Sequence, residues 1–198
     1  MSWTDETLEL IRCKAQGRVV SGLKRSELDN VQRILGYTWP PDLCELLRAG
    51  LPIGKGWPDW RALDRAGSLE AKDEPVQAIK RAIGWPLHGL LFDVENNSFW
   101  DPLWGERPES LEAAKEIATA ILKGAPPLIP VYMHRYLPAE PCEAGNPVLS
   151  VYQMDIIVYG QDLALYFVNE FGGAPTPQGL GKPIMCWTRW IEQPWARP

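Results

Sequence analysis

Two carboxylates near the middle of the chain have a spacing that could support chemistry. Asp93 and Glu95 follow the apolar run GLLF, and in a β-strand they would share one face at a separation of roughly 6–7 Å. Carboxyl pairs at such a distance serve inverting glycosidases as general acid and general base. That chemistry also needs a sugar-binding cleft and one carboxyl of raised pKa, and the residue pattern indicates neither. We therefore favour a solvated strand end that leads into the turn at Asn96 and Asn97.

The chain has two histidines, His88 and His134, and neither has local partners for catalysis. In the predicted strand, His88 would face away from Asp93 and Glu95, so the local sequence does not assemble a three-ligand metal site. His134 lies in an apolar run, where a hydrogen-bonded structural histidine is more common than a base. No Ser or Cys is spaced to serve as its nucleophile. We expect no metal, no cofactor and no catalytic residue.

Arg135 and Asp155 interrupt two predicted strands that are otherwise apolar. A charge in such a position is costly unless it is paired. We expect these residues to form a structural ion pair with each other or to cap backbone groups. A ligand-binding ion pair in a groove is the alternative that we favour less.

Neither the glycine spacing nor the cysteine spacing indicates a cofactor. GLPIGKG (residues 50–56) has three residues between its first two glycines, where a phosphate-binding loop has four, and Gly where that loop has Ser or Thr. We predict a turn after a helix there. The cysteines Cys13, Cys44, Cys142 and Cys186 are far apart and form no CxxC pair. This pattern favours reduced, partly buried thiols over a zinc site or a redox motif.

Helical spacing of apolar residues dominates the first two thirds of the chain. SELD (residues 26–29) resembles a capping box, and Pro41 suits a first helical turn. Glycines or prolines end the segments. The predicted helices cover residues 26–35, 41–49, 73–83, 109–123 and 162–171. In the helix over 109–123, we expect Ile117, Ile121 and Leu122 to pack on a sheet, because they form one uncharged stripe.

Strands are predicted between and after these helices. They cover residues 87–94, 128–137 and 148–159, the last as one long strand or a hairpin. The tail contains Pro175, Pro177 and Pro183 before a last short element around Trp187 and Trp190. Helices and strands mix without a strict βαβ rhythm. We therefore predict one α+β domain over residues 1–198, with a mostly antiparallel sheet flanked by helices.

The composition excludes several functional classes. The chain has 198 residues, of which 45% are hydrophobic and 23% charged, as in ordinary globular proteins. A net charge of −5 without a Lys/Arg stripe argues against nucleic-acid binding. There is no basic and apolar leader, and no apolar run approaches the roughly 20 residues that span a bilayer. We expect a cytoplasmic protein that binds neither nucleic acid nor membrane.

Ten tryptophans are unusual for this length. Several lie in segments rich in Pro, Asp and Gly, namely WPDW (Trp57 and Trp60), GWP (Trp85) and FWDPLWG (Trp100 and Trp104). Most indoles of a domain lie in its core. A tryptophan on a loop is also a common binding hot spot, so the sequence leaves core and interface open for each of them.

Four stretches together resemble the SUKH superfamily, also called the Smi/Knr family of cell-wall regulators and toxin-immunity proteins. They are PPDLCELLRAG (40–50), WPDWR (57–61), GLLFDVENNSFWDPLWGERP (89–108), and LIPVYMHRYLP (128–138) with GNPVLSVYQMDIIVYGQDLALYF (145–167). The best-matching region is 40–171. The resemblance implies a sheet flanked by helices and no agreed catalytic residues. It also implies that Phe99 and one tryptophan of the FWDPLWG corner are buried, with an acidic rim left for recognition.

The resemblance implies a bacterial immunity protein that neutralises a toxin by direct protein–protein binding. Because acids lie close to tryptophans and the net charge is negative, we expect an acidic, aromatic partner-binding surface and a basic partner such as a nuclease domain. The candidate surface comprises Trp57, Asp59, Trp60, Asp93, Glu95, Trp100, Asp101, Trp104 and Glu106. The alternatives are an intracellular regulatory or scaffold module and, less favoured, a hydrolase that uses Asp93 and Glu95.

Overall fold

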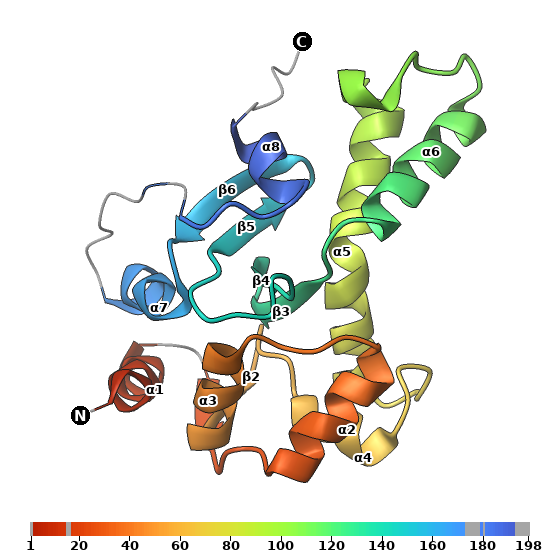
Figure 1. Ribbon diagram of the computed structural model, residues 1–198. Helices are drawn as coiled ribbons and strands as arrows, with labels where there is room; N and C mark the ends of the chain where they lie inside the picture. The colour runs from red at the N-terminus through yellow and green to blue at the C-terminus, as the bar shows by residue number, and fades with distance from the viewer. Residues whose placement is uncertain (1, 15–16, 173–178, 180, 193–198) are drawn as a thin grey trace.

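The computed structural model describes residues 2–14, 17–172, 179 and 181–192 (Figure 1). It has the mixed α+β architecture expected from the sequence, with more helix than strand. In chain order the elements are α1 (Trp3–Lys14), β1 (Gly17–Val20), α2 (Arg25–Leu35), α3 (Pro41–Ala49), β2 (Leu51–Gly54), α4 (Trp60–Ala66), α5 (Glu74–Asn96), the 3₁₀ turn η1 (Pro102–Trp104), α6 (Leu111–Lys123), β3 (Leu128–Tyr132), β4 (Arg135–Pro138), β5 (Val148–Tyr152), β6 (Asp155–Gly160), α7 (Leu163–Phe171) and α8 (Trp187–Glu192).

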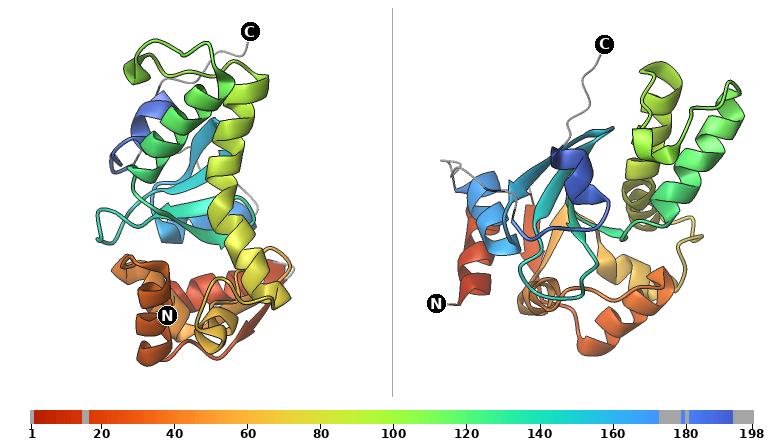
Figure 2. Two further views of the ribbon diagram at one scale, coloured as in Figure 1. Left: turned by 90° about the vertical axis from the view of Figure 1, so that its right-hand side faces the viewer. Right: turned by 45° about the horizontal axis from the view of Figure 1, so that its top comes forward.

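Two apolar clusters form the core, and helix α5 passes through both. The first cluster joins α1–α4 to α7 and one side of the sheet, and α5 contributes Val76 and Ile79 to it. The second lies among α6, α8 and the other side of the sheet, and α5 contributes Leu90 and Val94. Figure 2 shows α5 running from orange α2 and gold α4 at one end of the molecule to green α6 at the other. Helix α5 therefore connects the two halves.

The main sheet is antiparallel, with strands in the order β3-β4-β5-β6. The region 148–159 is a hairpin, one of the two arrangements that the sequence predicted, and it turns after Tyr152, which faces Asp155. The region 128–137 is also a hairpin instead of a single strand, and its turn contains Met133 and His134. A smaller antiparallel pair, β1 with β2, lies among the N-terminal helices.

Most predicted helix ends are confirmed, with two local corrections. Helix α2 begins at Arg25, and its start is capped by Glu27, which accepts a hydrogen bond from the Lys24 N–H at 2.6 Å; Ser26 is not the cap. The segment 50–56 contains strand β2 and only then a turn, because Leu51 and its neighbours pair with β1. Helix α7 begins after Asp162, as predicted. The Asp162 carboxylate accepts a hydrogen bond from the Leu165 N–H.

The predicted strand at 87–94 is wrong, because these residues continue helix α5. Gly84 and Pro86 suggested an interruption, and both lie inside the helix. Proline has no N–H, so the carbonyl of Ala82 loses its usual helical donor. The hydroxyl of Tyr136 on β4 replaces it with a hydrogen bond of 2.8 Å to that carbonyl. A long-range contact thus satisfies the group that the local sequence leaves unpaired.

Helix α6 packs along α5, and not on the sheet as the sequence suggested (Figure 2). Its fully buried residues are the small Ala114 and Ala118, which allow close approach to α5. Ile117, Ile121 and Leu122 are only half-buried. In the described residues, no helix is long and apolar enough to cross a membrane.

Two glycines within α5 should respond oppositely to alanine. An added Cβ at Gly84 would lie 3.5 Å from the tip of His88, an ordinary contact, whereas at Gly89 it would lie 2.7 Å from the Cα of Gln153. We expect Gly84→Ala to raise the free energy of unfolding by up to about 1 kcal/mol through helix propensity. Gly89→Ala should lower it by roughly 1–3 kcal/mol through overpacking. Urea denaturation of the two variants measures both, and equal effects would contradict a continuous helix seated on the β5–β6 turn.

Candidate protein-binding surface

Trp57 and Trp60 lie in the interior, so the prediction that they contact a partner is wrong. The ring of Trp57 packs 4.5 Å from that of Tyr132, measured between centroids, and stacks near Phe167. Trp60 meets Trp39 edge to face at 4.8 Å. Both indoles are buried in the first apolar cluster. Their neighbours Pro and Asp mark the start of helix α4, which turns the chain and carries these rings inward.

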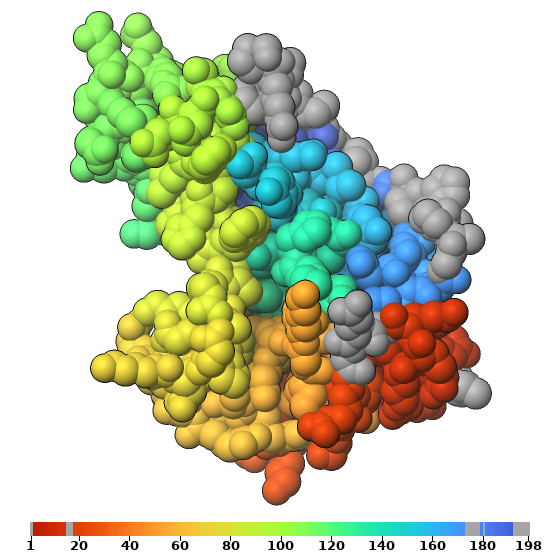
Figure 3. Space-filling view, turned by 180° about the vertical axis from the view of Figure 1, so that it is seen from behind, coloured from red at the N-terminus to blue at the C-terminus, as the bar shows by residue number. Residues whose placement is uncertain are grey.

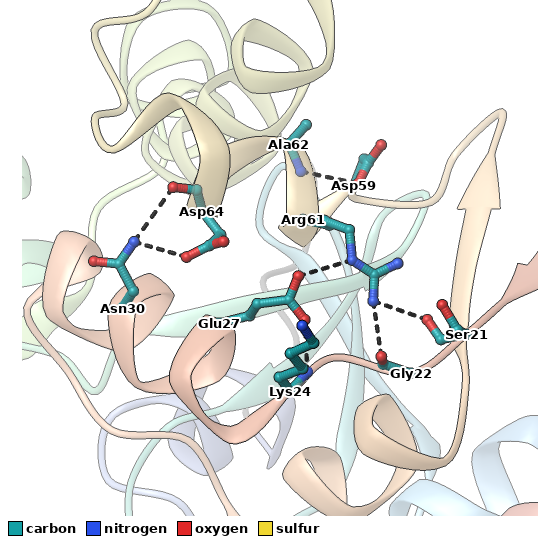
Figure 4. Close-up of polar contacts among 9 residues, drawn as sticks. All are labelled: Ser21, Gly22, Lys24, Glu27, Asn30, Asp59, Arg61, Ala62 and Asp64. Carbon is teal, nitrogen blue, oxygen red and sulfur yellow. Dashed lines mark hydrogen bonds and ion pairs between the residues drawn. The ribbon is translucent and has the colours of Figure 1, made fainter.

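The remaining polar residues of WPDWR fasten α4 to the N-terminal elements (Figure 4). Asp59 is the N-cap of α4 and accepts the Ala62 N–H at 3.0 Å. The Arg61 guanidinium donates to the Glu27 carboxylate at 3.0 Å and to the carbonyl oxygens of Ser21 and Gly22. The motif therefore has a structural role here.

The carboxylate of Glu27 joins two elements through its two oxygens. One accepts from the Lys24 N–H at the start of α2, and the other pairs with Arg61 of α4. Burial alone would raise the pKa of Glu27, but the hydrogen bonds from Lys24 and Arg61 outweigh it and lower that pKa. A second hydrogen bond between α2 and α4 runs from the Asn30 amide to the Asp64 carboxylate, at 2.7 Å.

Asp93 and Glu95 point apart and do not form an acid–base pair. The side chain of Asp93 is only 1% exposed. The prediction that it belongs to a binding surface is therefore wrong. It accepts the Met154 N–H at 2.8 Å and a hydrogen bond from the Asn97 amide, which fixes the end of α5 to the β5–β6 turn. Glu95 is exposed and pairs with Lys115 of α6 at 2.8 Å.

Asp101 is also structural, which corrects its assignment to the binding surface. It is buried and accepts two hydrogen bonds from the Arg189 guanidinium, at 2.7 and 3.0 Å. It also accepts from the Trp190 indole N–H at 3.0 Å and the Leu103 N–H at 2.9 Å. The bond from Arg189 is the largest of the effects that lower the pKa of Asp101, and they outweigh its burial. This carboxylate anchors α8 to the FWDPLWG corner.

The rest of the corner is a small aromatic cluster with an exposed tip. Phe99 is buried, as predicted, while Trp100 and Trp104 are both half-buried and meet edge to face at 5.0 Å. The Trp100 indole N–H donates to the Gly105 carbonyl at 2.8 Å. Leu103 is 72% exposed, and Glu106 is exposed beside it. Of the nine predicted residues, Glu95, Glu106 and parts of Trp100 and Trp104 remain accessible, and Asp59 is half-buried as a cap.

Arg135 forms its ion pair with Glu170 and not with Asp155. Its Nε lies 3.1 Å from the Glu170 carboxylate, and its Nη1 donates to Ser150 Oγ at 2.9 Å. The guanidinium also stacks 3.8 Å above the centre of the Tyr159 ring. Asp155 is exposed at the start of β6. The pairing differs because Glu170 comes from α7, which covers the sheet face that carries Arg135, and strand periodicity could not reveal that helix.

Sequence reasoning missed an exposed stripe on α5. Arg81, Trp85, His88 and Phe92 are all exposed and follow one another at helical spacing on one side. The predicted break at Gly84 and Pro86 concealed this spacing, because it assigned the four residues to a helix, a loop and a strand. A search for helical periodicity across the proline would have found the stripe.

The two hairpin turns extend this stripe into a larger apolar surface. Tyr152 lies 6.0 Å from Trp85 and 6.2 Å from His134, measured between ring centroids. Strand register places Ile157 on the same sheet face as Tyr152. We call Trp85, Phe92, Met133, Tyr152 and Ile157 the aromatic face; each is 41–53% exposed. Figure 3 shows yellow-green α5 beside the green and cyan segments of the two hairpins.

An open groove of about 390 Å³ lies at one end of the aromatic face. Its walls include Trp85, Met133 and Tyr136, and Arg81 and His134 supply polar groups. His134 is held in place because its Nε2 contacts the Arg135 guanidinium, an arrangement that requires a neutral imidazole. Burial, and then the charge of Arg135, lower the pKa of His134.

The backbone beneath the aromatic face is also fixed. The N–H of Met133 donates to the Gly56 carbonyl at 2.8 Å, and Gly89 brings α5 against the backbone of Gln153. Such fixed support lowers the entropy that a surface loses when a partner binds. Across the described part of the chain, no group of three His, Cys, Asp or Glu residues is arranged to hold a metal ion.

Comparisons with protein-family models, curated proteins and solved structures found no match. The resemblance to the SUKH superfamily therefore rests on the residues quoted above alone.

The charge of Asp101 should matter for stability and for its pH dependence. Asp101→Asn removes the ion pair with Arg189, and we expect it to lower the free energy of unfolding by roughly 1–3 kcal/mol at pH 7. Because the folded-state pKa is lowered, the contribution is complete above the unfolded value near 3.8 and is lost as pH falls through the folded value. Denaturation of both proteins between pH 7 and pH 3 measures the difference. A gap that stays constant over this range would contradict the ion pair.

Proposed function

We propose that this chain is a cytoplasmic, non-catalytic binding protein that neutralises a protein toxin by direct contact. The observation that carries the proposal is the aromatic face, whose five large apolar side chains are exposed on α5 and the adjacent hairpins, with Trp85 beside Tyr152 and sharing a groove with Met133. Single exposed apolar residues are normal on protein surfaces. A contiguous group rimmed by polar residues is typical of a site that another protein covers.

The residue types of the aromatic face suit protein recognition. Tryptophan and tyrosine are frequent hot spots, because each buries a large rigid surface and retains a polar atom for hydrogen bonding. Met133 adds a flexible side chain that adapts to a partner. Trp85 and Tyr152 lie next to each other, so they are the natural centre of the contact.

Charge would act at longer range than the aromatic face. The α5–α6 end of the molecule carries the exposed acids Glu95, Glu106, Glu109, Glu112 and Glu116, and the whole chain has a net charge of −5. Such a field accelerates association with a basic partner, and salt reduces the effect. A toxin domain that binds phosphates, such as a nuclease, would have that charge.

The catalytic alternative has less support. The hydrolase hypothesis needed Asp93 and Glu95 on one face of a strand, and the first is buried in hydrogen bonds to Met154 and Asn97. A buried carboxylate that caps backbone groups has no access to a substrate. The binding hypothesis requires no such group and uses side chains that solvent reaches.

The test is co-expression with a candidate toxin domain, chosen from the genes next to this one. We expect the native chain to restore growth and to bind the toxin in a pull-down that weakens with salt. Trp85→Ala combined with Tyr152→Ser should weaken binding by about 30-fold or more, because truncating a hot spot costs about 2 kcal/mol. The matched control is Val168→Ser on α7, an exposed apolar residue outside the aromatic face.

The control should bind and rescue as the native chain does. Circular dichroism and thermal melting of each variant must first show that the fold is intact. A folded Trp85/Tyr152 double variant that still binds and rescues fully would contradict the aromatic face as the contact. Failure of the native chain to bind the toxin would contradict the neutralising function itself.

A further inference from the structure

Two cysteines that are far apart in the sequence lie together in the fold. The thiol of Cys44 on α3 and the thiol of Cys142 in the β4–β5 loop both donate to the same acceptor, the carbonyl oxygen of Trp39. The distances from that oxygen are 3.8 Å to Cys44 Sγ and 3.4 Å to Cys142 Sγ, so the two sulfurs lie within about 7.2 Å of each other.

The segments that carry the two thiols are already fastened to each other. Asp42, in the first turn of α3, accepts the Gly145 N–H at 3.0 Å. Asn146, which is fully buried, donates from its side-chain amide to the carbonyl oxygens of Pro138 and Pro141 and so shapes the β4–β5 loop. A disulfide requires Cα atoms about 4.4–6.8 Å apart, and forms readily only where the backbone already holds its ends close.

We propose that Cys44 and Cys142 form a reversible intramolecular disulfide when the protein meets a low-molecular-weight disulfide such as oxidised glutathione. The pairing links α3 to the β4–β5 loop and closes a long loop of chain. It gives the thiols a role that their sequence spacing, without a CxxC motif, did not indicate.

The chemistry proceeds by two thiol–disulfide exchanges. Cys142 is exposed, so its thiolate attacks the small disulfide, forms a mixed disulfide and releases one small thiol. The thiolate of Cys44 then attacks Cys142 Sγ, forms the protein disulfide and releases the second small thiol. The two protein thiols are oxidised by two electrons, the small disulfide is reduced by two, and the two protein protons end on the released thiols.

The second exchange should limit the rate. Burial is the largest effect on Cys44 and raises its pKa to about 11, so little thiolate is present at neutral pH. The rate of ring closure should therefore rise about tenfold for each pH unit between pH 7 and pH 9. The mixed disulfide at Cys142 should accumulate before closure.

The other two cysteines provide internal controls. Cys13 is exposed on α1, where its thiol donates to Glu9, and Cys186 is half-buried next to α8. Cys13→Ser with Cys186→Ser leaves only the proposed pair. In this background we expect incubation with oxidised glutathione to give a protein about 2 Da lighter than the reduced form, with Cys44 linked to Cys142 on peptide mapping.

Reduction with dithiothreitol should restore the original mass. Because a cross-link across a long loop restricts the unfolded chain, the oxidised protein should melt roughly 5–15 °C higher than the reduced protein. Adding Cys142→Ser, at an exposed position, should abolish both changes and leave the reduced melting temperature unaltered. Adding Cys44→Ser should stop the reaction at the mixed disulfide.

Three results would overturn the proposal. The first is that the folded variant with Cys13→Ser and Cys186→Ser forms the mixed disulfide of Cys142 with glutathione and goes no further at any pH. The second is a disulfide that forms only between molecules, seen as a dimer on a non-reducing gel. The third is native protein in which Cys13 or Cys186 pairs with either thiol in preference to the Cys44–Cys142 link.

Discussion

The hydrogen bond from the Tyr136 hydroxyl to the Ala82 carbonyl is the contact on which the architecture most depends. Pro86 removes the N–H that this carbonyl would accept within a helix, and an unpaired carbonyl beside a sheet costs roughly 1–3 kcal/mol. Tyr136 is fully buried on β4, and its hydroxyl lies 2.8 Å from the carbonyl. Burial raises the pKa of Tyr136, so the hydroxyl remains a donor at physiological pH. This bond thus satisfies the carbonyl that Pro86 leaves without a helical donor, and it joins the middle of α5 to the sheet.

A continuous α5 in turn sets the position of everything that contacts it. Its first half contributes to the first apolar cluster, and its second half contributes to the second. Asp93 then fixes its end to the β5–β6 turn through the Met154 N–H. The same helix carries Trp85 to the hairpins, where it lies beside Tyr152, and it exposes Phe92 on the same side. Trp85 and Phe92, the α5 residues of the aromatic face that we propose for toxin binding, therefore lie on one side only because the helix continues through its proline.

Local patterns predicted the elements whose signals are local. The proline at the start of α3, Gly124 after α6 and Asp162 before α7 act through their own backbone neighbours, so these helices were found close to their observed limits. The hairpin at 148–159 was one of two arrangements left open, and strand pairing decides between them. The α+β class followed from the order of these elements.

Predictions failed where a distant residue decides the outcome. Residues 87–94 resemble a strand in isolation, and Tyr136, which lies far away in the sequence, supplies the donor that the helical path through Pro86 lacks. Arg135 was paired with Asp155 because both interrupt strands, whereas Glu170 approaches from α7. The sequence places Asp101 in an exposed acidic rim, whereas in the structure Arg189 and Trp190 of α8 donate hydrogen bonds to it. The proximity of Cys44 and Cys142 likewise depends on how α3 docks against the β4–β5 loop.

A double-mutant cycle on Tyr136 and Pro86 tests this account most directly. Tyr136→Phe removes the hydroxyl alone, and Pro86→Ala restores a backbone N–H for the Ala82 carbonyl. The account predicts that Tyr136→Phe lowers the free energy of unfolding by roughly 1–3 kcal/mol in the native chain and by much less beside Pro86→Ala. Costs that agree in both backgrounds within about 0.5 kcal/mol would show that the hydroxyl does not replace the missing donor, and would contradict the account.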